Sequence, residues 1–119
     1  MAFKKLGAPP SPRHSPLTAR LRPGATQGHD HMDLSVGARR AIGRPRAVIF
    51  EWDEDEWLLR IVASSHADPA SRLLPESGRL SIAPVLRMIG VNVDVARTLP
   101  LKQDGPLALI ADLSEYRSR

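Results

Sequence analysis

The chain carries one pattern of residues twice, and this repeat restricts its fold more than any other feature. In residues 78–90 a short segment of alternating apolar residues leads into a segment that begins near Pro84 and ends at Gly90, which is typical of a strand followed by a short helix. Two apolar segments separated by the turn residues 103–106 follow, and they predict a hairpin. Residues 33–65 repeat this order, with Ile-Gly again at the end of the helix. The sequence therefore predicts two strand-helix-hairpin units.

The apolar positions within each unit indicate how the units pack. In the second unit we expect Arg87 to point away from an apolar helix face formed by Val85, Leu86, Met88 and Ile89. In the first unit, residues 47–52 and 57–63 are expected strands with apolar residues on both faces, which favours a barrel over an open sheet. The predicted fold is mainly β (α+β), a small β-barrel made of the two repeats.

Residues 1–28 differ in composition from the rest of the chain. They contain five prolines and three glycines, which prevent a regular helix and exclude a central sheet strand. We expect an extended, flexible arm, with an edge strand over residues 17–21 as the alternative for that segment, because its apolar residues alternate. The expected division of the chain is this arm, a first half over residues 29–65, a linker over residues 66–77 and a second half over residues 78–115.

The residue types argue against several classes of function. The 119 residues include no cysteine, so disulfides, thiolate nucleophiles and Cys-ligated zinc are excluded. No apolar run approaches the length of a membrane span, and we expect a cytoplasmic protein without membrane contact. No catalytic pattern is found, so no enzymatic activity, cofactor or small-molecule substrate is expected. His29-Asp30-His31 lacks further ligands, and the acidic turn 53–56 lacks the spacing of a calcium loop, so we expect no metal site.

The positive charges are concentrated in two segments. Residues 1–28 carry no acidic residue, whereas the remaining twelve Lys and Arg residues are balanced by thirteen Asp and Glu residues. The basic residues of the arm are Lys4, Lys5, Arg13, Arg20 and Arg22, and those of the second segment are Arg39, Arg40, Arg44 and Arg46. Such clusters favour a polyanionic partner, because each phosphate contact releases counterions. For the second segment, stabilisation of a helix C-terminus by arginine is the alternative.

Residues 78–90 resemble the AbrB/MazE/SpoVT family of swapped-hairpin β-barrel DNA-binding proteins. The resemblance rests on Gly78-Arg79-Leu80-Ser81-Ile82 and on Leu86-Arg87. Pro84 falls one position late for the family pattern, Gly90 follows one residue early, and the first repeat has Met32-Asp33 in place of Gly-Arg. The resemblance implies interleaved hairpins, which two repeats would close into a barrel within one chain, as in two-motif relatives of the MraZ group. It also implies DNA-facing roles for Arg79 and Arg87, and for Arg39 and Arg40 in the first repeat.

Together these features favour DNA binding by a transcriptional regulator or an antitoxin-type protein. The expected nucleic-acid-binding residues are Arg39, Arg40, Arg44, Arg46, Arg79 and Arg87, with Lys4, Lys5, Arg13, Arg20 and Arg22 of the arm adding affinity. The alternative is a small accessory subunit whose barrel and proline-rich arm dock on a larger protein or ribonucleoprotein complex. A homodimer is compatible with either hypothesis, and the sequence distinguishes neither DNA from RNA nor one target site from another.

Overall fold

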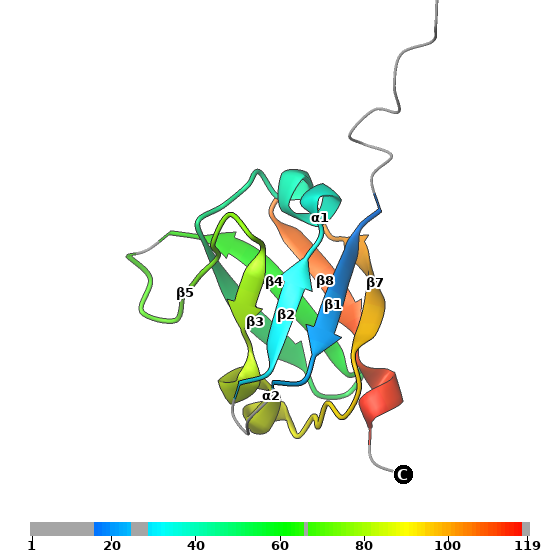
Figure 1. Ribbon diagram of the computed structural model, residues 1–119. Coiled ribbons are helices and arrows are strands. Elements are labelled where there is room, and N and C mark those ends of the chain that lie inside the picture. The colour runs from blue at the N-terminus through cyan, green and yellow to red at the C-terminus, as the bar shows by residue number, and fades with distance from the viewer. Residues whose placement is uncertain (1–15, 25–28, 66, 118–119) are drawn as a thin grey trace, which may run out of the picture.

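The computed structural model of the chain describes residues 16–24, 29–65 and 67–117 (Figure 1). Each unit is preceded by a further strand that the sequence did not assign to it. With that strand, the first unit comprises β1 (Thr18–Arg22), β2 (His31–Leu34), α1 (Val36–Ala41), β3 (Ala47–Asp53) and β4 (Leu58–Ser64). The second unit comprises β5 (Arg72–Leu73), β6 (Arg79–Ser81), α2 (Ala83–Ile89), β7 (Arg97–Gln103) and β8 (Ala108–Asp112). A 3₁₀ helix, η2 (Ser114–Tyr116), follows. The two units thus have the same order of elements.

The eight strands form one antiparallel sheet that curls into a nearly closed barrel. Their order is β5-β3-β4-β8-β7-β1-β2-β6, and the two end strands, β5 and β6, do not pair with each other in the described chain. Alternate residues of the strands point into the barrel. The fully buried side chains there include Leu21, Met32, Leu59, Ile61, Leu80 and Leu109. The predicted fold class, a small mainly β barrel with short helices, is confirmed.

The strand pairing relates the two units by an approximate twofold axis. The strand β2 pairs with β6, its counterpart in the second unit, and β4 pairs with its counterpart β8. The leading strand of each unit pairs with the hairpin of the other, β1 with β7 and β5 with β3. If each strand is replaced by its counterpart in the other unit, the same order of strands around the barrel is obtained. An internal duplication predicts this symmetry. The pairing differs only at the seam, because β1 pairs with β2 whereas β5 does not pair with β6.

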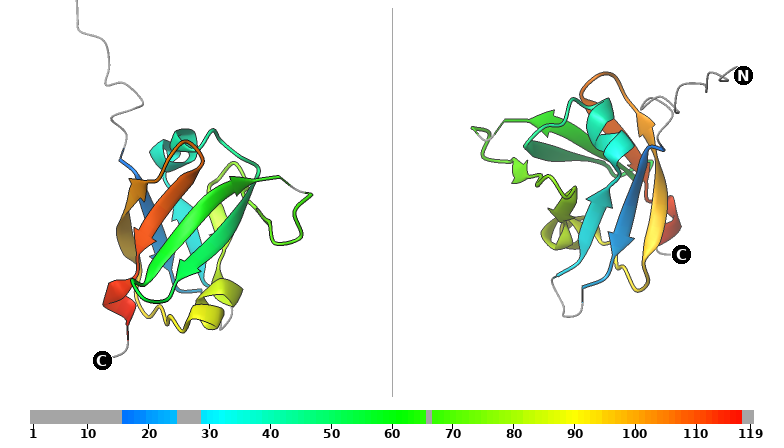
Figure 2. Two further views of the ribbon diagram at one scale, coloured as in Figure 1. Left: turned by 180° about the vertical axis from the view of Figure 1, so that it is seen from behind. Right: turned by 45° about the horizontal axis from the view of Figure 1, so that its top comes forward.

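The two helices lie at opposite ends of the barrel (Figures 1 and 2). Ser35 is the N-cap residue of α1, and its hydroxyl accepts a hydrogen bond from the Ala38 N–H at 3.1 Å. Pro84 lies in the first turn of α2. Both helices are followed by a glycine in the left-handed conformation, with φ of 83° at Gly43 and 77° at Gly90. The predicted helix ends at Ile-Gly are confirmed.

The arm predicted over residues 1–28 is wrong for Thr18–Arg22. This segment is the strand β1, which pairs on both sides and completely buries Ala19 and Leu21, so it is not an edge strand either. The prediction failed because Pro16 and Pro23 flank the segment without interrupting it, and both neighbouring strands supply hydrogen-bond partners. Residues 1–15 and 25–28, including Lys4, Lys5 and Arg13, lie outside the described residues.

Two features of the second unit also differ from expectation. Met88 is 82% exposed, so it does not belong to the buried face of α2. That face consists of Ala83, Val85 and Leu86 with Ile89 at its margin, and Met88 lies beyond the edge of this stripe. The predicted linker over residues 66–77 contains the short strand β5, which pairs with β3.

Candidate nucleic-acid interface

The outer surface of β1, β2 and β6 carries three of the arginines predicted from the sequence. Because strand residues alternate between the two faces, Arg20, Arg22 and Arg79 project outward while their neighbours are buried. The strand pairing aligns Arg20 with Asp33, and Asp33 with Arg79, in one row across the sheet. We call Arg20, Arg22, Asp33 and Arg79 the basic strand face. It carries three positive charges and one negative charge.

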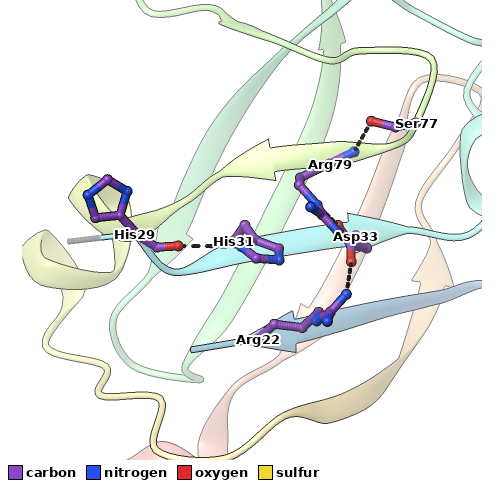
Figure 3. Close-up of polar contacts among 6 residues, drawn as sticks. All are labelled: Arg22, His29, His31, Asp33, Ser77 and Arg79. Atoms are coloured by element: carbon purple, nitrogen blue, oxygen red, sulfur yellow. Dashed lines mark hydrogen bonds and ion pairs between the residues drawn. The ribbon is translucent and has the colours of Figure 1, made fainter. Parts of the chain in front are cut away.

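Asp33 holds two of these arginines (Figure 3). Its carboxylate accepts hydrogen bonds from Arg79 Nε at 3.0 Å and from Arg22 Nη1 at 3.4 Å. Partial burial raises the pKa of the Asp33 carboxyl, but the hydrogen bonds from both arginines and the charges of Arg79 and His31 together lower it below the ordinary value of 3.8. Exposed ion pairs of this kind contribute at most about 1 kcal/mol each. The arginines can therefore exchange Asp33 for a phosphate at little cost.

A depression at the α1 end of the barrel brings together three further predicted arginines. Its volume is about 530 Å³. The lining consists of Arg39, Arg44 and Arg46, the acidic Glu76, and the apolar side chains Val36, Pro45, Leu74 and Pro75. We call this depression the arginine pocket. In the part of the chain that the structure describes, none of the three arginines takes part in an ion pair.

Hydrogen bonds fix both walls of the arginine pocket. The Leu74 N–H donates to the Arg46 carbonyl at 2.8 Å, which joins the end of β5 to the start of β3. Arg39 Nη1 donates to the Glu76 carbonyl. The Arg39 side chain lies against Gly78, where a Cβ would come within 3.0 Å of Arg39 Nε. The absence of a side chain at Gly78 thus leaves the space that Arg39 occupies.

The two remaining predicted arginines lie far apart. Arg40 is exposed on α1, at the same end of the barrel as the arginine pocket, and Arg87 is exposed on α2 at the other end (Figure 1). The acidic turn between β3 and β4 also lies at the α2 end, where Glu54 and Met88 line one shallow depression. The predicted arginines therefore do not form one continuous surface, and Arg87 shares its end with acidic residues.

Three residues that shape these sites were not predicted as site residues. The alternation of residues 31–34 is enough to place Asp33 on the outside, but its partners depend on the register between strands, which no local pattern gives. Leu74 and Glu76 belong to the predicted linker. They reach the arginine pocket because β5 pairs with β3, a contact between segments distant in the sequence.

The other polar clusters have local structural roles. Asp53 Oδ1 accepts hydrogen bonds from the N–H groups of Asp55 and Glu56 at 3.0 and 3.1 Å, which closes the acidic turn. Asp30 Oδ1 accepts one from the Gly24 N–H at 3.0 Å. Among the described residues no group of three His, Asp or Glu side chains is placed to hold a metal ion. No helix in the same residues has the length and apolar character needed to cross a membrane.

Comparisons with protein-family models, with curated proteins and with solved structures found no match to this chain. Function must therefore be inferred from the arrangement of the chain's own residues. The feature that requires an explanation is the concentration of arginine on one face and at one end of the barrel.

Proposed function

We propose that this chain is a cytoplasmic DNA-binding protein, of the transcriptional-regulator or antitoxin type, which contacts DNA with the basic strand face and the α1 end of the barrel. The observation that carries the proposal is the projection of Arg20, Arg22 and Arg79 from the strands β1 and β6 on either side of β2, which supplies a single carboxylate, that of Asp33. Arginines in such an array suit contacts with successive phosphates, which position a protein on DNA.

The distribution of charge over the barrel supports one orientation on DNA. The α1 end carries Arg39, Arg40, Arg44 and Arg46, whereas the α2 end carries the acidic turn of residues 53–56. A polyanion is attracted to the first end and repelled from the second. Arg39 at the α1 end donates a hydrogen bond to the Glu76 carbonyl, and Arg79 of the basic strand face lies only three residues after Glu76. The α1 end and the basic strand face are therefore next to each other.

The duplication supplies a matched pair of variants for testing this orientation. Arg40 and Arg87 both lie three residues before the glycine that follows their helix, and both are exposed. We expect Arg40→Gln to weaken binding to a labelled duplex and to reduce the salt slope by about 1, as the loss of one phosphate contact does. Arg87→Gln should leave both quantities unchanged. Fluorescence anisotropy between about 50 and 200 mM salt measures the slope.

The basic strand face is tested by the triple variant Arg20→Gln, Arg22→Gln, Arg79→Gln. These side chains are exposed, so we expect the variant to stay folded, with a melting temperature lowered by at most about 8 °C through the loss of the two ion pairs to Asp33, and to lose most of its affinity for DNA. A duplex library reports sequence preference, and a matched RNA competitor separates DNA from RNA. Equal losses for Arg40→Gln and Arg87→Gln, or no binding of the parent chain at low salt, contradict the proposal.

A docking role as a small accessory subunit is the second candidate function, and one observation favours it. Met88 is 82% exposed at the α2 end and lines a shallow depression together with Trp52, Trp57 and Ile89 and with the charged residues Glu54 and Arg117. Apolar side chains bordered by charged ones suit a protein partner. Docking through it would persist as salt rises and would be lost in Met88→Glu, whereas DNA binding should weaken with salt and tolerate that substitution.

A further inference from the structure

The two units have different residues at three equivalent positions, one within the helix and two after it. The Arg44 N–H donates to the Arg39 carbonyl at 2.8 Å, and the Val91 N–H donates to the Leu86 carbonyl at 2.9 Å. The intervening glycines, Gly43 and Gly90, both have left-handed φ. Counted from these glycines, the equivalent pairs are Arg39 and Leu86, Arg44 and Val91, and Arg46 and Val93.

The second unit uses these positions for its core. Leu86, Val91 and Val93 are 1%, 7% and 6% exposed, and they belong to the hydrophobic cluster of the barrel. In the first unit the same positions carry the three guanidinium groups that line the arginine pocket. The α1 end therefore has an open pocket of about 530 Å³ lined by cations, where the α2 end has packed aliphatic side chains.

The charges of the arginine pocket are poorly balanced within the chain. The residues that line it include three arginines and one acidic residue, Glu76. Arg39 is held in place by its hydrogen bond to the Glu76 carbonyl, yet its buried Nε finds no acceptor among the described residues. Arg44 has φ of 51°, a conformation that a residue other than glycine adopts at an energetic cost. Backbone strain and uncompensated charge in one concave site indicate an anionic ligand.

We propose that the arginine pocket binds the phosphoryl group of a small molecule whose remaining part is apolar or planar, such as a mononucleotide. The planar fork of arginine matches the oxygens of a phosphoryl group. Val36, Pro45, Leu74 and Pro75 provide an apolar wall for the rest of the ligand. The volume lies within the range of about 300–1,000 Å³ that small-molecule sites occupy. No pattern in the sequence predicts a small-molecule ligand.

This inference does not depend on DNA binding. Arg20, Arg22 and Arg79 of the basic strand face do not line the arginine pocket. The arginines of the pocket also belong to the α1 end that is proposed to face DNA, but a compact ligand can enter the pocket in the absence of a duplex. A small ligand and DNA can therefore be tested separately, with no DNA present in the first experiment.

The experiment titrates the full chain with adenosine 5′-monophosphate, inorganic phosphate and adenosine, at an ionic strength held constant with sodium chloride. Calorimetry measures affinity, and ¹H–¹⁵N NMR follows the Nε–H signals of the arginine side chains. We expect phosphate and the monophosphate to bind, the monophosphate more tightly, and adenosine not to bind. The Arg39 Nε–H signal should shift with either phosphorylated ligand.

Single substitutions that each remove one charge locate the site. Arg44→Gln and Arg46→Gln, made separately, should each weaken binding of the monophosphate about tenfold or more, because each exposed side chain donates a charge-assisted hydrogen bond to the ligand. Arg40→Gln removes a charge from α1 outside the pocket and should change the affinity less than about twofold.

Three results would overturn the proposal. The first is no binding of the monophosphate, and the second is equal binding of adenosine, which would remove the role of the phosphoryl group. The third is an equal loss in Arg40→Gln, which would assign the binding to diffuse positive charge. If the pocket variants impair only duplex binding, the pocket belongs to the DNA-contacting surface and the small-ligand proposal is wrong.

Discussion

Gly78 provides the space on which both the barrel and the arginine pocket depend. Its φ is 81°, and its carbonyl accepts a hydrogen bond from the Leu34 N–H at 2.8 Å where β2 and β6 meet. A Cβ at this position would lie 2.5 Å from the Leu34 carbonyl oxygen and 3.0 Å from Arg39 Nε. The long Arg39 side chain can move aside, but the Leu34 carbonyl belongs to the backbone. Gly78→Ala therefore forces the ends of two paired strands apart.

The size of this effect follows from a comparison with Gly105. An alanine in the left-handed region costs about 1 kcal/mol, part of which it regains by restricting the unfolded chain. Both terms apply equally to Gly105→Ala, because Gly105 has φ of 79° and no atom within 4 Å of its would-be Cβ. The forced backbone shift at Gly78 adds roughly 1–3 kcal/mol. The difference should lower the melting temperature of Gly78→Ala by at least about 4 °C relative to Gly105→Ala.

Thermal and urea unfolding, followed by circular dichroism, measure the two variants side by side. A second substitution, Arg39→Ala in the Gly78→Ala background, removes the side-chain contact and leaves the contact with the Leu34 carbonyl. We expect most of the destabilisation to persist in this double variant. Equal melting temperatures for Gly78→Ala and Gly105→Ala would show that the close approach to Leu34 carries no energetic weight, and would refute this account of the junction.

Three further predictions concern the core, the start of α1 and the basic strand face. Leu59 is fully buried, so Leu59→Ala should cost about 2–5 kcal/mol in urea unfolding, whereas Met88→Ala should change stability by less than about 0.5 kcal/mol. Ser35→Ala removes the N-cap acceptor of α1 and the hydroxyl that donates to the Pro16 carbonyl, and should cost about 1 kcal/mol; Ser35→Gly, which keeps a favourable cap residue, should cost less. Because the pKa of Asp33 is lowered in the folded chain, its stabilisation is complete at neutral pH and is lost as the pH falls below 3.8 through the folded pKa. Asp33→Asn should therefore flatten the acid limb of a stability–pH curve, and it should strengthen DNA binding by freeing Arg22 and Arg79. An unchanged acid limb would contradict the assigned ion pairs.

The elements that the sequence predicted well are those with strong local signals. Both helices could be located because Ile-Gly ends each of them, and a left-handed residue at that position favours glycine irrespective of the rest of the fold. Both hairpins could be located because two apolar segments flank a short polar turn in each case. The repetition of these signals also predicted that two similar halves build the barrel.

The features that the sequence did not predict depend on contacts between distant segments. The segment Thr18–Arg22 becomes a central strand because β2 and β7 pair with it, although nearby prolines favour an arm. The arginine pocket needs β5 to pair with β3, which carries Leu74 and Glu76 to the side of Arg39. Neither register can be obtained from local periodicity, since the same residues satisfy several pairings. The basic residues were found from the sequence, but their division into two separate sites was not.

The difference in charge between the two ends of the barrel and the break in its symmetry meet in the same part of the structure, at the arginine pocket. The symmetry of the two units exchanges the two ends of the barrel. Where both units have the same residue type at equivalent positions, as with Arg40 and Arg87, that residue is found at both ends. The two ends can therefore differ only at positions where the two units have different residues. At the α2 end, Leu86, Val91 and Val93 complete the core. At the α1 end the equivalent arginines cannot do so, and Leu74 is buried there instead.

Leu74 is available for this role because it lies in the segment between β5 and β6, the two strands that do not pair. Its N–H bonds to Arg46, and Glu76, two residues later, accepts a hydrogen bond from Arg39, so the segment crosses to the α1 end. Had β5 paired with β6 as β1 pairs with β2, this segment would have been held in a hairpin and the far wall of the pocket would be missing. The open seam and the three arginines thus act together, since the seam segment supplies one wall of the arginine pocket and the arginines supply its positive charge.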